Sequence, residues 1–231
     1  EYSKWFVTRL NTNGIKMTAD LCERLKKASL DSCQITFYSS EEDVHNKLVG
    51  ADQFRNTVAG IDNALEAGLN ISINTPLCTL NRNYINTLEF LRDRGVRYVT
   101  CSGLITTGNA LGEESSSLQL DGEELKTILQ FAADFCKENG MEISFTSPGW
   151  IEKEFFEKLG LNMPTCGACL SNMAITPGGN VVPCQSFLSA DPLGSMLNDN
   201  WDDIWMSEAC QNRRDFSAKM TGECPLRRIS K

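Results

Sequence analysis

The sequence has a single histidine, His45, and this scarcity excludes several kinds of active site. A chain with one histidine cannot form a histidine-rich zinc site or most histidine acid–base mechanisms. It also cannot form a Ser-His-Asp triad that does not use His45. His45 itself follows an acidic turn, Glu41-Glu42-Asp43. We therefore expect its ring to make a structural hydrogen bond rather than to act in catalysis.

Long apolar runs and clustered cations are also missing. No apolar run approaches the ~20 residues that cross a bilayer, so no membrane association is expected. The net charge is −8 and no Lys/Arg run exceeds two residues. Phosphate-backbone binding depends on clustered cations, so nucleic acid is not an expected partner. The first residues, Glu1-Tyr2-Ser3-Lys4, lack the features of a signal peptide, and a cytoplasmic location is the default expectation.

Cysteine, in contrast, is abundant, with ten residues. Without an export signal, a framework of disulfides is poorly supported, and metal or iron–sulfur ligation is the better interpretation for some of them. Four cysteines lie on apolar helix faces or in strands, where cysteine packs as a small hydrophobe. We expect these four to be core residues: Cys22, Cys33, Cys101 and Cys136.

Residues 1–160 alternate short β-rich runs with longer helical ones. Five such repeats, most with a helix ended by glycine or Asn-Gly, indicate parallel βαβ units and an α/β fold. Helical periodicity fades near residue 162, and residues 174–182 carry a hairpin signal around Pro177-Gly178-Gly179. The sequence therefore predicts two domains, 1–160 and 161–231. The expected strands cover 5–10, 32–38, 69–73, 96–101 and 141–145, and the expected helices cover 18–28, 52–67, 84–94, 123–137 and 201–208.

Polar residues follow each predicted strand. In parallel α/β barrels these positions face one shared cavity, where ligands bind. Hydroxyl, amide and backbone groups there suit a polar ligand, although single residues of this kind more often cap helices and form turns. The segments are 11–13, 38–39, 74–75, 102–103 and 146–147.

A second candidate site is formed by cysteines near the C-terminus. Cys166-Gly167-Ala168-Cys169 is a C-x-x-C motif, Cys184 ends the hairpin, and Cys224 lies in the tail. Thiolates on such a turn can share a metal or cluster. A set of buried, reduced cysteines without metal remains an alternative, whereas a thioredoxin-like redox role is disfavoured because the motif does not link a strand to a helix.

Several motifs in the first domain resemble those of radical S-adenosylmethionine (SAM) enzymes. Thr12-Asn13-Gly14 is similar to the tripeptide after the third barrel strand of that family. Residues 34–39 with Val44-His45 resemble the next strand and its loop, and residues 54–68 resemble the following helix. The resemblance implies a partial parallel (β/α) barrel of the radical SAM type.

Residues 161–231 resemble a SPASM or shortened twitch domain, which binds auxiliary iron–sulfur clusters. The family pattern is Cys-x-x-Gly, a hairpin ending in Pro-Cys and a Pro-Leu-Gly turn, reproduced here between Cys166 and Gly194. The resemblance implies one auxiliary [4Fe–4S] cluster. Its ligands would be Cys166, Cys184, Cys224 and either Cys169 or Cys210, with Cys169 favoured because it occupies the family's usual glycine position.

The resemblance also implies an activity for the complete enzyme. SAM would be cleaved reductively, and the 5′-deoxyadenosyl radical would abstract a substrate hydrogen. Thr12, Asn13 and Thr36 would contact SAM, with Asn74 a weaker candidate; Thr36 keeps the hydroxyl of a family serine. The Cys-x-x-x-Cys-x-x-Cys motif that holds the catalytic [4Fe–4S] cluster is not in this chain. We expect that motif on an upstream segment, and we expect the chain alone to be inactive.

The expected partners are a peptide, protein or small-molecule substrate and an electron donor such as flavodoxin or ferredoxin. Two alternatives remain open. The same thiolates could form a tetrahedral zinc site in a scaffold protein. Alternatively, the barrel could bind a partner without catalysis.

Overall fold

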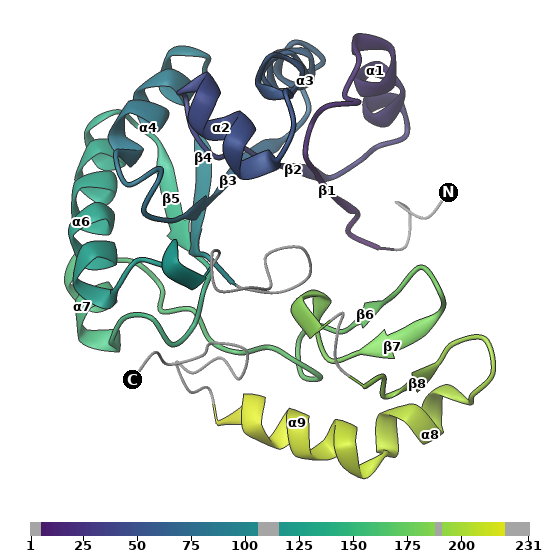
Figure 1. Cartoon of the computed structure of the whole chain (residues 1–231). Coiled ribbons are helices and arrows are strands. Elements are labelled where there is room, and N and C mark those ends of the chain that lie inside the picture. The colour runs from purple at the N-terminus through teal and green to yellow at the C-terminus, as the bar shows by residue number, and fades with distance from the viewer. Residues whose placement is uncertain (1–5, 106–115, 188–190, 220–231) are drawn as a thin grey trace. The chain divides into compact units, whose positions relative to one another are not determined.

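The computed structural model describes residues 6–105, 116–187 and 191–219 (Figure 1). These residues fall into two compact units. The first runs to Leu104 and resumes from Leu120 to Thr146, and the second contains the remaining described residues. The division at Thr146 precedes the boundary at residue 160 that the sequence predicts, and that boundary stays a prediction.

The first unit is built on a five-stranded parallel sheet, which confirms the predicted α/β class. The strands lie side by side in chain order, as expected for consecutive right-handed βαβ units. The first strand is shifted toward the predicted turn, since it begins at Arg9. The strands are β1 (Arg9–Thr12), β2 (Ser32–Thr36), β3 (Ile71–Leu77), β4 (Tyr98–Gly103) and β5 (Glu142–Phe145).

Five helices of this unit lie on one side of the sheet (Figure 1). Four of them match the predicted helices within two residues. The fifth, α2, is unexpected, because it begins inside the predicted acidic turn. Glu42 and Asp43 occupy its first turn, where negative charge stabilises a helix. The helices are α1 (Ala19–Lys27), α2 (Glu42–Val49), α3 (Phe54–Glu66), α4 (Tyr84–Asp93) and α6 (Gly122–Glu138).

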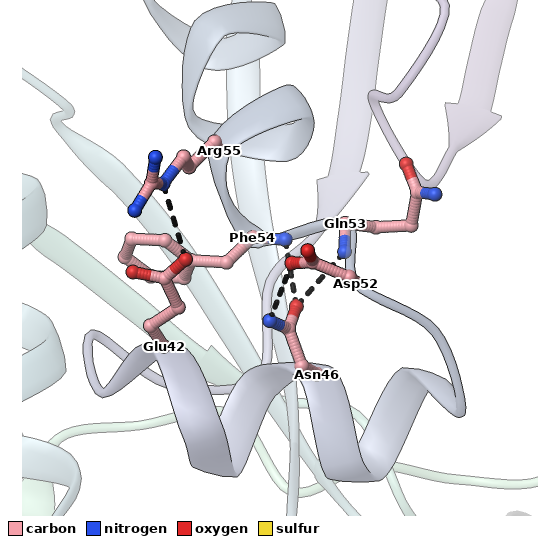
Figure 2. A network of polar contacts seen from close by, with 6 residues as sticks. All are labelled: Glu42, Asn46, Asp52, Gln53, Phe54 and Arg55. Carbon is pink, nitrogen blue, oxygen red and sulfur yellow. Dashed lines mark hydrogen bonds and ion pairs between the residues drawn. The ribbon is translucent and has the colours of Figure 1, made fainter.

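The start of α3 is capped by a residue from α2 rather than by its own N-cap, Gln53 (Figure 2). Asn46 Oδ1 accepts hydrogen bonds from the backbone N–H groups of Gln53 at 2.9 Å and Phe54 at 2.8 Å. Asn46 Nδ2 donates to Asp52 Oδ1 at 2.9 Å. One side chain therefore satisfies two N–H groups that a helix start leaves unpaired.

The second unit contains a three-stranded antiparallel sheet of order β6-β7-β8. The pairing of β6 with β7 confirms the predicted hairpin, and Gly179 in its turn has a left-handed φ of 84°. None of the helices within the described ranges is long and apolar enough to cross a membrane. The elements are α7 (Lys153–Leu159), β6 (Ala174–Ile175), β7 (Asn180–Val182), η3 (Gln185–Phe187), β8 (Gly194–Ser195), α8 (Trp201–Met206) and α9 (Glu208–Ala218).

Candidate functional site

The parallel sheet has one apolar and one polar face. Residues of β2, β3 and β4 alternate along each strand between buried and half-exposed positions. The buried positions include Cys33, Ile35, Ile73 and Cys101. Strand neighbours in register share a face, so the half-exposed residues form a continuous polar surface. That surface carries Gln34, Thr36, Ser72, Asn74, Thr100 and Ser102.

A chain of side-chain hydrogen bonds crosses this polar face. Gln34 Nε2 on β2 donates to Thr100 Oγ1 on β4 at 3.0 Å. The Thr100 hydroxyl in turn donates to Asn74 Oδ1 on β3, which lies between the two strands, at 2.9 Å. Gln34 and Thr100 were not predicted as site residues, although the alternation of polar and apolar residues in their strands was a usable signal.

The four predicted SAM contacts separate into two pairs. Thr36 and Asn74 are register partners on the polar face. Thr12 instead pairs with Ile35, which puts it on the opposite face, and its hydroxyl accepts a hydrogen bond from Gly14 N at 3.2 Å. Asn13 follows the end of β1, and its Oδ1 accepts from Ile15 N at 3.3 Å. The structure thus brings Thr36 and Asn74 together, whereas Thr12 and Asn13 hold the turn. Their contact with SAM stays a prediction.

Buried side chains fix the loops that follow β2 and β3. Asn81 Nδ2 donates to the carbonyl of Tyr38 at 2.8 Å and to that of Pro76 at 3.0 Å. Asn81 Oδ1 accepts from the backbone N–H of Cys78 at 2.7 Å. Because one amide joins both loops, the carboxyl ends of neighbouring strands are held in a fixed relation. Cys78 is itself buried.

His45 makes the structural hydrogen bond that the sequence predicts. Its Nδ1 accepts from the backbone N–H of Tyr38 at 3.3 Å. The ring is fully buried beside the rings of Phe37 and Phe54, with centroids at 4.9 Å and 5.7 Å. Burial lowers the pKa of His45 to about 4, so the ring is neutral near pH 7.

In the second unit, two of the predicted cluster ligands are half-buried thiols with hydrogen-bond donors. Cys166 Sγ lies 3.6 Å from the Ser217 hydroxyl of α9. Cys184 Sγ accepts from Ser186 N at 3.4 Å. Hydrogen bonds to sulfur are a usual feature of iron–sulfur ligation, where they tune the cluster's potential.

Cys169 has a different environment from Cys166 and Cys184. It is fully buried and has a left-handed φ of 57°, which suits the glycine usual at this position of the family pattern. The thiol of Cys210 on α9 is its neighbour. Burial first, and then this contact with Cys210, raise the pKa of Cys169 to about 12. The choice of Cys169 over Cys210 as a ligand stays a prediction.

The donor set fits an iron–sulfur cluster in its chemistry, since soft thiolates with nearby N–H and O–H donors are what such clusters use. Within the described ranges, however, no three side chains of His, Cys, Asp or Glu are gathered closely enough to hold one metal ion. The fourth predicted ligand, Cys224, lies outside the described residues. The four cysteines expected in the core, Cys22, Cys33, Cys101 and Cys136, are all buried.

A cavity of about 360 Å³ lies in the first unit at the helices α4 and α6. It is lined by Tyr84, Ile128 and Phe131, among others, with Arg82 and Glu124 paired at 3.0 Å. None of the predicted site residues lines it, so it is not the candidate site.

Comparisons with known proteins agree with this geometry. Residues 166–226 match the SPASM family, described as an iron–sulfur cluster-binding domain. The chain is 24% identical to a GTP 3′,8-cyclase of Aliarcobacter butzleri, covering 87% of this chain and 62% of that protein. It is 22% identical to an AdoMet-dependent heme synthase of Oleidesulfovibrio alaskensis, covering 93% and 58%.

The fold is also similar to that of a solved structure, Streptococcus suis SuiB bound to precursor peptide SuiA. The TM-score is 0.69 at 15% identity, over 91% of this chain and 50% of that one. The chain thus spans about 60% of the length of the curated relatives above. Taken together, the parallel sheet, the cysteine pattern and these similarities confirm the predicted resemblance to radical SAM enzymes, and residues 166–226 are the part of the chain that matches the SPASM family.

Proposed function

We propose that this chain is part of a radical SAM enzyme that modifies a peptide or protein, with an auxiliary [4Fe–4S] cluster in its C-terminal domain. One observation carries the proposal. A SPASM match over residues 166–226 occurs in the same chain as a parallel sheet with a polar face. When bound, the catalytic cluster supplies the electron that cleaves SAM to the hydrogen-abstracting radical. We expect that cluster on a part of the protein outside this chain.

The polar face suits binding and orientation rather than acid–base chemistry. Apart from Pro76, its residues on β2, β3 and β4 carry hydroxyl and amide groups. Such groups hold a polar ligand without competing for protons, which fits an enzyme whose cofactor carries the difficult chemistry. Thr36 and Asn74 are the residues we assign to SAM on this face. Thr12 and Asn13 would contribute through the turn after β1.

In the C-terminal domain, Cys166 and Cys184 are the described residues best suited to ligate the cluster. Both thiols are half-buried and both lie near a hydrogen-bond donor. Cys224, in the tail, is the third ligand that the family resemblance implies. A flavodoxin or ferredoxin is the proposed electron donor.

The substrate class is proposed from the similar proteins. The SuiB structure contains a precursor peptide, which favours a peptide substrate for this chain as well. A small molecule is the second candidate, because the curated relatives are named as a GTP cyclase and a heme synthase.

The first experiment measures iron, sulfide and zinc in the full-length protein after anaerobic purification and reconstitution. We expect Cys184→Ala to lose about four irons and four sulfides relative to the wild type. The control Cys136→Ala removes a buried thiol of α6 and should lose none. About one zinc per chain, with iron unaffected by Cys184→Ala, would support the zinc scaffold and reject the auxiliary cluster.

A further inference from the structure

The hydrogen-bond chain on the polar face fixes the direction of one amide. A threonine hydroxyl carries a single proton, and that of Thr100 is donated to Asn74 Oδ1 at 2.9 Å. Thr100 Oγ1 also accepts the N–H of Gln34 Nε2 at 3.0 Å, which directs its proton toward Asn74. Asn74 therefore has its oxygen engaged toward β4.

The other end of the Asn74 amide carries two N–H donors. None of the hydrogen bonds made among the described residues uses these donors. Asn74 is half-exposed and lies in register with Thr36 on the polar face. The face therefore presents hydrogen-bond donors at this position, in a direction set by two side chains from neighbouring strands.

We propose that Gln34 and Thr100 are positioning residues that hold the Asn74 amide so that its N–H groups bind an oxygen acceptor of SAM. This proposal rests on the proposed function, since it names SAM as the ligand of the polar face. It adds a specificity rule: the site accepts an oxygen that receives hydrogen bonds, such as a carboxylate or ribose oxygen. If the amide turned over, its oxygen would meet the ligand oxygen, and the two acceptors would repel.

The hydrogen bonds that link Gln34, Thr100 and Asn74 are better explained by a role in positioning the Asn74 amide than by a contribution to stability alone. The three residues are half-exposed, so water could satisfy each of them without a partner. In the structure the two hydrogen bonds hold the Asn74 amide in one of two orientations that have almost the same shape. That selection matters only to a group that meets Asn74 from the open side of the sheet.

Two substitutions test the proposal directly. Asn74→Asp keeps the oxygen that accepts from Thr100 but replaces the N–H donors with a second acceptor. We expect it to weaken SAM binding about 30-fold or more, as for a lost and reversed polar contact. Thr100→Val keeps the side-chain shape and removes the hydroxyl, and we expect about 5-fold weaker binding. Thr100→Ser restores the hydroxyl and should bind nearly as the wild type does.

The measurement is the Kd for SAM of the reconstituted full-length protein, by equilibrium dialysis without reductant, so that SAM stays intact. Thr127→Val is the matched control, because it makes the same change as Thr100→Val at a hydroxyl on α6 that donates to the Glu123 carbonyl and does not belong to the polar face. A double-mutant cycle adds a readout that a merely structural role would not give. If Thr100 acts through Asn74, Thr100→Val should have no further effect on Kd in an Asn74→Ala background.

The outcomes separate this proposal from the proposed function. Wild-type affinity for SAM in both Asn74→Asp and Thr100→Val would overturn the positioning role, while the radical SAM assignment would stand. Additive effects of Thr100→Val and Asn74→Ala would also overturn it. If the wild-type protein loaded with its clusters fails to bind SAM, the proposed function and this inference both fall.

Discussion

At the scale of single residues, His45 predicts how stability depends on pH. Because it is the only histidine in the chain, any histidine titration belongs to it. Its pKa is lowered by burial to about 4, whereas an unfolded chain has a histidine pKa near 6.5. Below about pH 6.5 the unfolded state binds a proton that the folded state rejects. The free energy of unfolding should therefore fall by up to about 3 kcal/mol between pH 6.5 and 4 because of His45.

The measurement is urea unfolding of the wild type and of His45→Asn at several pH values. Asparagine keeps an oxygen that can accept from Tyr38 N but does not titrate. The difference in unfolding free energy between the two proteins isolates His45 from carboxylates that titrate at low pH. A constant difference from pH 7 to 4 would contradict the assigned pKa.

Cys169 gives a second residue-scale prediction, because its left-handed φ of 57° favours glycine. Cys169→Gly should relieve about 1 kcal/mol of backbone strain and lose a similar amount with the buried thiol. We therefore expect a melting temperature close to the wild type. The variant therefore tests ligation without changing stability. If Cys169 is the fourth ligand of the cluster, the iron content of Cys169→Gly should be lower than that of the wild type. Full iron in Cys169→Gly combined with loss in Cys210→Ala would assign that role to Cys210.

At the scale of secondary-structure elements, the long-range cap of α3 by Asn46 should contribute measurably to stability. Asn46→Ala removes the oxygen that accepts from Gln53 N and Phe54 N. We expect a loss of about 1–2 kcal/mol in the free energy of unfolding, as for other N-cap truncations. Asn56→Ala is the control, because Asn56 makes one exposed side-chain contact on α3 and should change stability by less than about 0.5 kcal/mol. Equal losses in both variants would reject the capping role.

The elements also show what sequence reasoning can and cannot reach. Local signals worked well: Gly68, Gly95 and Gly140 follow the ends of α3, α4 and α6, and each has a left-handed φ. Non-local contacts were not predictable in the same way. Asn46 caps a helix from another helix, and Cys169 meets Cys210 across 41 positions. No local pattern encodes such pairs, since packing of distant segments creates them.

The candidate site shows the same division. Thr36 and Asn74 were predicted as SAM contacts only from the family resemblance, and the register of β2 with β3 places both on one face. Thr12 was predicted as a SAM contact from the same resemblance, but the face on which it lies depends on the register of β1 with β2. Because β1 starts at Arg9 and pairs in the register that opposes Thr12 to Ile35, Asn11 shares the polar face instead. A one-residue change of register moves a side chain to the other face, and this is the information that sequence patterns specify least.

At the scale of the whole molecule, the two units have very different sheets. The first unit has five paired strands with a buried apolar face, whereas the strands of the second have only two or three residues. Short strands bury little apolar surface, so we expect the second unit to depend on its cluster for stability. Removal of iron should then loosen the second unit and leave the first nearly unchanged.

Hydrogen exchange of the full-length protein with and without its clusters measures this difference. The auxiliary cluster binds only the folded state. Its loss should therefore speed amide exchange in β6, β7 and α9 by about 10-fold or more. Exchange in β2, β3 and β4 should change by less than about 2-fold, provided that the catalytic cluster is retained. Cys184→Ala meets that condition, since it removes only the proposed auxiliary site. An equal increase in exchange throughout both units would mean that they unfold together, and the auxiliary cluster would then stabilise the whole molecule.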